Sequence, residues 1–201
     1  MAHPNYERAL ARSDLSQWVV HFVRAHSLIT PQQLGNSAQI LDNIFREMWI
    51  RPSRLDYVTK YSPEGAACFY DAPPRVWNEI ALTNPSGRQP IGIIIPKSTL
   101  WQLGGRPVIY TELNNPNIWP ESERYRIVHT DLSRFPQPID WTHEREWRIR
   151  GGLRLTQPNW GHIWWWPIVP NDQWLNYLWA TYPGLKSIYV IERNGLVNRS
   201  P

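Results

Sequence analysis

The chain has 201 residues, of which 42% are hydrophobic, and a formal net charge of +4 at pH 7. This length predicts a single domain over residues 16–193, with an N-terminal arm over residues 1–15 and a tail over residues 194–201. No apolar run approaches the roughly 20 residues that span a bilayer. The first residues lack the apolar segment of a signal peptide, so we expect a cytoplasmic protein with no membrane partner.

The basic residues and the tryptophans indicate a kind of partner. Only Lys60, Lys97 and Lys186 are lysines, so the other eighteen basic residues are arginines, and the chain has thirteen tryptophans. Arginine makes bidentate contacts with phosphate and stacks on planar rings, which suits a surface that meets nucleotides or nucleic acid. A core that uses tryptophan, in a chain from a GC-rich genome, would give the same composition. The single cysteine, Cys68, excludes an internal disulfide framework and a cysteine-rich zinc module.

In the first half of the chain, apolar runs predict three strands over residues 15–23, 66–70 and 91–95. Between the first two, Thr30 and Pro31 begin a predicted helix that ends before Pro52. Its core-facing stripe has helical spacing and consists of Leu41, Ile44, Phe45 and Met48. We expect a short helix over residues 74–82 and another over residues 97–103.

In the second half, the pattern predicts strands over residues 107–110, 139–150, 162–169 and 185–191. A helix is expected over residues 123–132, and a second helix begins at Asn171 or Asp172 and is closed by Gly184. About seven strands with a few helices between them indicate the α+β class, a single domain of mixed, mostly antiparallel sheets.

Residues 139–150 carry the densest chemistry in the sequence. On a strand, Glu144, Glu146 and Arg148 share one face, because successive side chains alternate. Two acids on one face need a cation, an arginine or a sugar hydroxyl beside them. A solvated edge strand with alternating charges is the structural alternative. A metal nuclease that uses Asp140, His143, Glu144 and Glu146 is a more distant one.

The order of short motifs resembles a known group of proteins. His21-Phe22 on the first strand, a helix, a basic turn, Cys68-Phe69, Ile91-Gly-Ile-Ile, Pro107-Val-x-Tyr and Glu144-Arg-Glu-Trp-Arg148 follow one another. This order resembles the AbiGi-like and DUF2971-type proteins of abortive phage-infection loci. Their layout is in turn similar to a divergent ADP-ribosyltransferase fold, as in the DNA-modifying DarT toxins and RNA 2′-phosphotransferases.

The resemblance implies an NAD site and roles for particular residues. Glu146 would be the catalytic acid, and Glu144 would position the acceptor. The cofactor-binding residues would be His21 and Phe22 on the first strand, Arg51 or Arg54 near the pyrophosphate, and Phe69 or Tyr70 against nicotinamide. The middle strand has Ala66-Ala67-Cys68 where arginine-modifying transferases have a Ser-Thr-Ser segment, which favours the DarT-like or His-Tyr-Glu types.

The chemistry agrees with that assignment. Cleavage of the bond between ribose and nicotinamide passes through an oxocarbenium-like state, which an ionised carboxylate stabilises. We therefore expect an ADP-ribosyltransferase of the glycosyltransferase class that uses NAD, needs no metal, and modifies a base of DNA or RNA. It would act as a toxin or phage-defence effector, and a cognate antitoxin is a candidate partner. The alternative is an inactive module that binds nucleic acid or a partner toxin. In the enzyme, His21, Tyr70 and Glu146 should line one pocket within roughly 10 Å.

Overall fold

The structure is a computed structural model that describes residues 16–24, 36–77, 79, 88–113, 115–155 and 164–200. Contacts between residues divide the chain into two compact units. The first unit consists of Met1–Met48, Ala72–Pro96 and Trp164–Pro201, and the second of Trp49–Asp71 and Lys97–Ile163. The strands pair mostly antiparallel and helices are few, so the predicted α+β class is confirmed. Among the described residues, no helix is long and apolar enough to cross a membrane.

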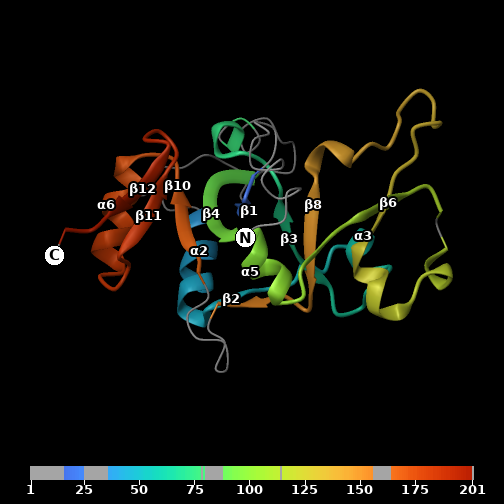
Figure 1. Cartoon of the computed structure of the whole chain (residues 1–201), viewed down its shortest axis with the longest axis horizontal. Coiled ribbons are helices and arrows are strands. Elements are labelled where there is room, and N and C mark those ends of the chain that lie inside the picture. The colour runs from blue at the N-terminus through green and yellow to red at the C-terminus, as the bar shows by residue number, and fades with distance from the viewer. Residues whose placement is uncertain are drawn as a thin grey trace, which may run out of the picture. The chain divides into compact units, whose positions relative to one another are not determined.

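The first unit has a mixed sheet at its centre (Figure 1). Its strands are β1 (Trp18–Arg24), β4 (Arg88–Pro96), β10 (Trp166–Val169), β11 (Ser187–Val190) and β12 (Gly195–Asn198). They lie in the order β12-β11-β10-β4-β1, and every pair is antiparallel except β10–β11. In β1 and β4, consecutive residues such as Val19 and Val20 are fully buried, because both faces of these strands are covered.

Helices α2 and α6 of this unit lie within the described residues. Helix α2 (Asn36–Glu47) packs against β1 and β4 with the predicted stripe, of which Leu41, Ile44 and Phe45 are buried. Helix α6 (Asp172–Thr181) begins as predicted. The Asn171 side chain caps it by accepting a hydrogen bond of 3.2 Å from the backbone N–H of Trp174. The predicted helix start at Thr30 and Pro31 lies outside the described residues.

A glycine fixes how closely β1 and β4 approach. Gly92 pairs with Phe22 across the two strands. A Cβ atom on Gly92 would lie 1.9 Å from the carbonyl oxygen of His21, so no other residue fits there without moving the strands.

In the second unit, the described strands pair as follows. β8 (Glu146–Arg150) pairs antiparallel with β3 (Ala66–Tyr70) on one side and β5 (Arg106–Pro107) on the other. β2 (Trp49–Ile50) pairs antiparallel with β9 (Leu153–Arg154). β6 (Ile109–Thr111) pairs parallel with β7 (Ile127–His129).

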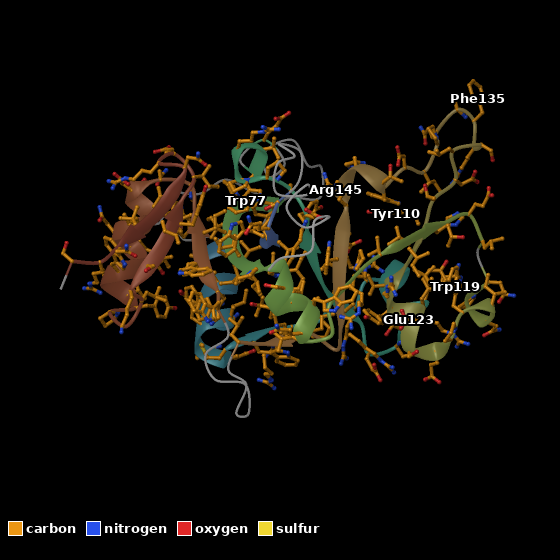
Figure 2. All side chains as sticks on the ribbon, viewed as in Figure 1. Trp77, Tyr110, Trp119, Glu123, Phe135 and Arg145 are labelled. Carbon is orange, nitrogen blue, oxygen red and sulfur yellow. The ribbon has the colours of Figure 1, made fainter. Side chains whose placement is uncertain are left out.

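Short helices and loops connect these strands. The α-helical segments are α3 (Asp56–Thr59) and α5 (Lys97–Gln102), and the 3₁₀ turns are η3 (Pro116–Ile118), η4 (Glu121–Arg126) and η5 (Thr142–Glu144). After β7, a loop closed by backbone hydrogen bonds between Asp131 and Ile139 holds Phe135 at its outer end, in solvent (Figure 2).

Several sequence-based predictions need correction. Residues 123–132 do not form one helix, because η4 is followed directly by β7. Residues 107–110 are divided between β5 and β6. The helix predicted over residues 74–82 begins with the 3₁₀ turn η2 (Pro74–Val76) and has helical residues at Trp77 and Glu79, and its other positions lie outside the described residues. Residues 195–198, expected in a tail, form β12 and pair with β11. The single domain over residues 16–193 stays a prediction.

Candidate functional site

The two acids of the Glu-x-Glu motif do not lie on one strand, and this part of the prediction is wrong. Glu144 ends the 3₁₀ turn η5, and β8 begins only at Glu146. Between them Arg145 has a left-handed backbone, with φ 43°, which breaks the alternation of the strand. Both acids are nevertheless only 7% exposed. Glu144 is therefore buried at the end of a 3₁₀ turn, and Glu146 is buried at the start of a strand.

Tyr70 brings Glu144 to the end of β3. Tyr70 is the cross-strand partner of Glu146, so their side chains lie on one face of the β3–β8 pair. The Tyr70 hydroxyl donates a hydrogen bond of 2.8 Å to Oε1 of Glu144. One tyrosine therefore lies beside both acids.

Glu146 forms a buried ion pair with Arg148. Because the two residues are two apart on β8, their side chains share a face as predicted. Nε and Nη2 of Arg148 each donate to one carboxylate oxygen of Glu146, both at 3.1 Å. Nη1 of Arg148 donates to the carbonyl oxygens of Tyr125 and Ile127, at 3.2 and 3.1 Å, and Arg148 is only 1% exposed. The geometry fixes the Glu146 carboxylate firmly and ties β8 to the start of β7.

Tyr110 completes the cluster from β6. Its hydroxyl oxygen accepts a hydrogen bond of 3.0 Å from the backbone N–H of Glu146. Burial raises the pKa of the Tyr110 hydroxyl to about 12, and the negative charges of Glu146 and Glu144 also raise it. That both charges act on Tyr110 indicates that the two carboxylates lie near one another. We call these five residues the acid cluster, which consists of Tyr70, Tyr110, Glu144, Glu146 and Arg148.

A second ionic group adjoins the acid cluster. Asp71 follows Tyr70, and its Oδ2 lies 2.6 Å from Nζ of Lys97 and 3.6 Å from Nη2 of Arg145. The Asp71 backbone N–H also donates to the Arg145 carbonyl oxygen, at 3.2 Å. No pattern in the sequence predicted this group. Its only signal is that Asp71 follows Tyr70 and that Arg145 lies between the two acids.

Of the cofactor-binding residues predicted in the second unit, Tyr70 belongs to the acid cluster, whereas Phe69, Arg51 and Arg54 do not. Phe69 is fully buried opposite Trp147, on the other face of the β3–β8 pair from Tyr70. Arg51 and Arg54 flank Ser53, which pairs with Ala66 at the start of β3. That end of β3 lies four residues from Tyr70, or roughly 13 Å by strand rise.

His21 and Phe22 belong to the first unit. They are neighbours on β1, so their side chains point to opposite faces of that strand. Phe22 is buried in the core, while His21 is partly exposed. The convergence of His21 with Tyr70 and Glu146 stays a prediction.

The charges of the acid cluster determine which chemistry it can support. Two carboxylates and one guanidinium give the acid cluster a net formal charge of −1 at neutral pH. A fixed negative charge in a buried site stabilises positive charge that develops beside it. In the part of the chain that the structure describes, no group of three or more His, Cys, Asp or Glu side chains could hold a metal ion.

Comparison of the chain with protein-family models, with curated proteins and with solved structures finds no match. The function is therefore inferred from the residues of the site itself.

Proposed function

We propose that the chain is an NAD-dependent ADP-ribosyltransferase that modifies a nucleic-acid base and serves as a toxin or phage-defence effector. The observation that carries the proposal is the burial of Glu144 and Glu146 in one cluster with the Tyr70 hydroxyl. Glycosyl transfer needs such a pair, because one carboxylate stabilises the oxocarbenium and a second removes a proton from the acceptor.

Each acid has a role in the proposed reaction. The bond between C1′ of the ribose and the nicotinamide nitrogen breaks, and nicotinamide leaves with the electron pair. Glu146, oriented by the two hydrogen bonds from Arg148, stabilises the positive charge at C1′. Glu144, held by Tyr70, accepts the proton that the attacking nitrogen of the base loses as the new bond forms. The Tyr70 ring would also pack against the nicotinamide.

The test uses the full chain with NAD and a panel of DNA and RNA oligonucleotides. Released nicotinamide and a mass gain of one ADP-ribose on an oligonucleotide are the expected results. Glu146→Gln should reduce the rate by roughly 100-fold or more. Glu144→Gln should abolish transfer and spare hydrolysis of NAD. Glu64→Gln is the matched control, because Glu64 also pairs with an arginine, Arg150, but on the surface.

Three results would contradict the proposal or part of it. If the wild-type chain releases no nicotinamide and modifies no oligonucleotide, it is not a transferase of this kind. If Glu146→Gln is as active as the wild type, Glu146 is not the catalytic acid. A flat dependence of oligonucleotide affinity on salt would argue against nucleic acid as the acceptor, because arginine contacts with phosphate release counterions.

A second candidate is an inactive module that binds nucleic acid or a partner toxin. The specific observation in its favour is that Arg148 uses its guanidinium for Glu146 and for two backbone carbonyls. The Glu146–Arg148 pair can therefore stabilise the fold without having any role in catalysis. In that case binding of the partner should survive Glu146→Gln whenever the variant is folded, and NAD should have no effect on it.

A further inference from the structure

Trp101, Arg106 and Trp147 form an aromatic group in the second unit, and Trp101 exposes it to solvent. Trp101 lies on α5 and is 50% exposed. Cζ of Arg106 lies over the Trp101 ring, 3.8 Å from its centroid. Trp147 on β8 meets Trp101 edge to face, with ring centroids 6.2 Å apart and ring planes at 69°. We call these three residues the tryptophan platform.

Arg106 fixes the orientation of the Trp101 ring. Its Nη1 donates hydrogen bonds to the carbonyl oxygens of Trp101 and Gly105, both at 2.7 Å. One guanidinium is therefore held by the backbone that follows α5 and lies against the indole, to which a cation is attracted. Because the ring is already held in place, a ligand that covers it immobilises little further side-chain freedom.

The exposure of Trp101 separates it from the other tryptophans that the structure describes. Trp141 and Trp164 are also exposed, at 47% and 66%, but neither has a described cationic group over its ring. The adjacent Leu100 is fully buried, so α5 packs through Leu100 and leaves Trp101 at the surface. An aromatic ring that is fixed by an arginine and still half exposed is suited to stack on a planar ligand.

We propose that the tryptophan platform binds an unpaired base of single-stranded nucleic acid, which stacks on the exposed part of the Trp101 ring. Stacking on an aromatic side chain accepts any base, because every base has a flat face. A net charge of +4 favours an anionic polymer as the ligand. In a duplex the faces of each base are covered by its neighbours, so the platform should prefer single strands. This inference rests on the proposed function in taking nucleic acid as the partner, but it does not depend on cleavage of NAD.

The platform and the acid cluster contact different parts of the nucleic acid. Trp147 directly follows Glu146 on β8, so the two side chains point to opposite faces of that strand. The base that stacks on Trp101 is therefore a neighbour of the modified base and not the modified base itself. Its role is to hold the strand in position.

The test measures binding of a fluorescein-labelled single-stranded oligonucleotide to the full chain by fluorescence anisotropy. The same sequence as a duplex and a strand of equal length with abasic sites are the comparison ligands. The wild type should bind the normal single strand most tightly. Trp101→Ala should weaken that binding by roughly 5- to 100-fold, because one stacked base is lost. Trp101→Phe should retain part of the affinity, whereas Trp101→Leu, which is apolar but not planar, should behave like Trp101→Ala.

Two controls separate stacking from other effects. Trp164→Ala removes another exposed tryptophan, in the first unit, and should leave the affinity unchanged. The loss caused by Trp101→Ala should be the same at about 50 and 200 mM salt, because a stacked base releases no counterions. Alanine favours a helix, so circular dichroism of Trp101→Ala should match the wild type. If Trp101→Ala does not fold, the comparison of Trp101→Phe with Trp101→Leu decides the question.

The outcomes distinguish the platform from the proposed reaction. If single strands bind and need Trp101 but NAD is not cleaved, the platform stands and the transferase fails. If NAD is cleaved and single strands bind Trp101→Ala as tightly as the wild type, the transferase stands and the platform is overturned, as it would be if a protein covered Trp101. Equal binding of normal and abasic strands, or no binding of any oligonucleotide by the wild type, would also overturn the platform.

Discussion

Removing the charge of Glu146 should cost the fold a large part of its stability. Glu146→Gln takes away the negative charge that accepts two hydrogen bonds from the Arg148 guanidinium, which is 1% exposed. Breaking a buried pair in this way costs about 3–5 kcal/mol of the free energy of unfolding. For a chain of this length each kcal/mol lowers the melting temperature by about 2–4 °C. We therefore expect a decrease of roughly 6–20 °C.

A second substitution tests the cause. The double variant Glu146→Gln/Arg148→Met removes the buried guanidinium charge as well, and the apolar methionine side chain fills much of the space of Arg148. Such a replacement of a buried ion pair is often neutral or stabilising. The carbonyl oxygens of Tyr125 and Ile127 lose their donor, which costs about 1 kcal/mol each. The double variant should therefore unfold at a higher temperature than Glu146→Gln but at a lower one than the wild type.

Urea denaturation followed by tryptophan fluorescence measures the stability of the wild type, Glu146→Gln, Glu146→Gln/Arg148→Met and Glu64→Gln. Glu64→Gln is the control, because Glu64 and Arg150 form their ion pair on the surface, and its unfolding curve should match the wild type. If Glu146→Gln unfolds within about 1 kcal/mol of the wild type, Arg148 is not held as described. If the double variant is the least stable of all, the uncompensated charge is not the cause of the loss.

Three further predictions concern other parts of the molecule. Burial raises the pKa of Tyr110 to about 12, so the folded chain holds this proton more tightly than the unfolded chain. The stability that this proton provides is present below about pH 10 and lost towards about pH 12, and urea midpoints should fall less steeply over that range in Tyr110→Phe. Asn171→Ala should lower the free energy of unfolding by about 1 kcal/mol, measured by urea denaturation, because it removes the cap of α6. Gly92→Ala should prevent stable folding, as seen by circular dichroism, whereas Gly184→Ala should be tolerated, since nothing lies within 4 Å of its added Cβ.

The elements that the sequence predicts best are those with long, regular apolar patterns. β1, β4, α2 and α6 carry such patterns, and packing in the core agrees with the local preference of their residues. Residues 123–132 failed because Tyr125 and Val128 are buried by η4 and β7 in succession, and a helical spacing of apolar residues does not distinguish that from one helix.

The candidate site was predictable only where its contacts are local. The shared face of Glu146 and Arg148 follows from strand alternation, and the structure bears it out. The turn at Glu144 depends on a left-handed Arg145, a conformation that an arginine does not signal in advance. The contacts of Asp71 with Lys97 and of Tyr70 with Glu144 join segments far apart in sequence, and no local preference determines them.

The same ion pair also separates the two candidate functions. A purely structural Glu146 is needed only to neutralise Arg148, so any function of the chain should return when Glu146→Gln/Arg148→Met restores part of the stability. A catalytic Glu146 is needed for its charge beside the ribose, and that charge is absent from the double variant however well it folds. Release of nicotinamide should therefore stay at least roughly 100-fold below wild type while the melting temperature recovers. Recovery of both together would leave Glu146 with a structural role alone, and the binding module would be the better account of this fold.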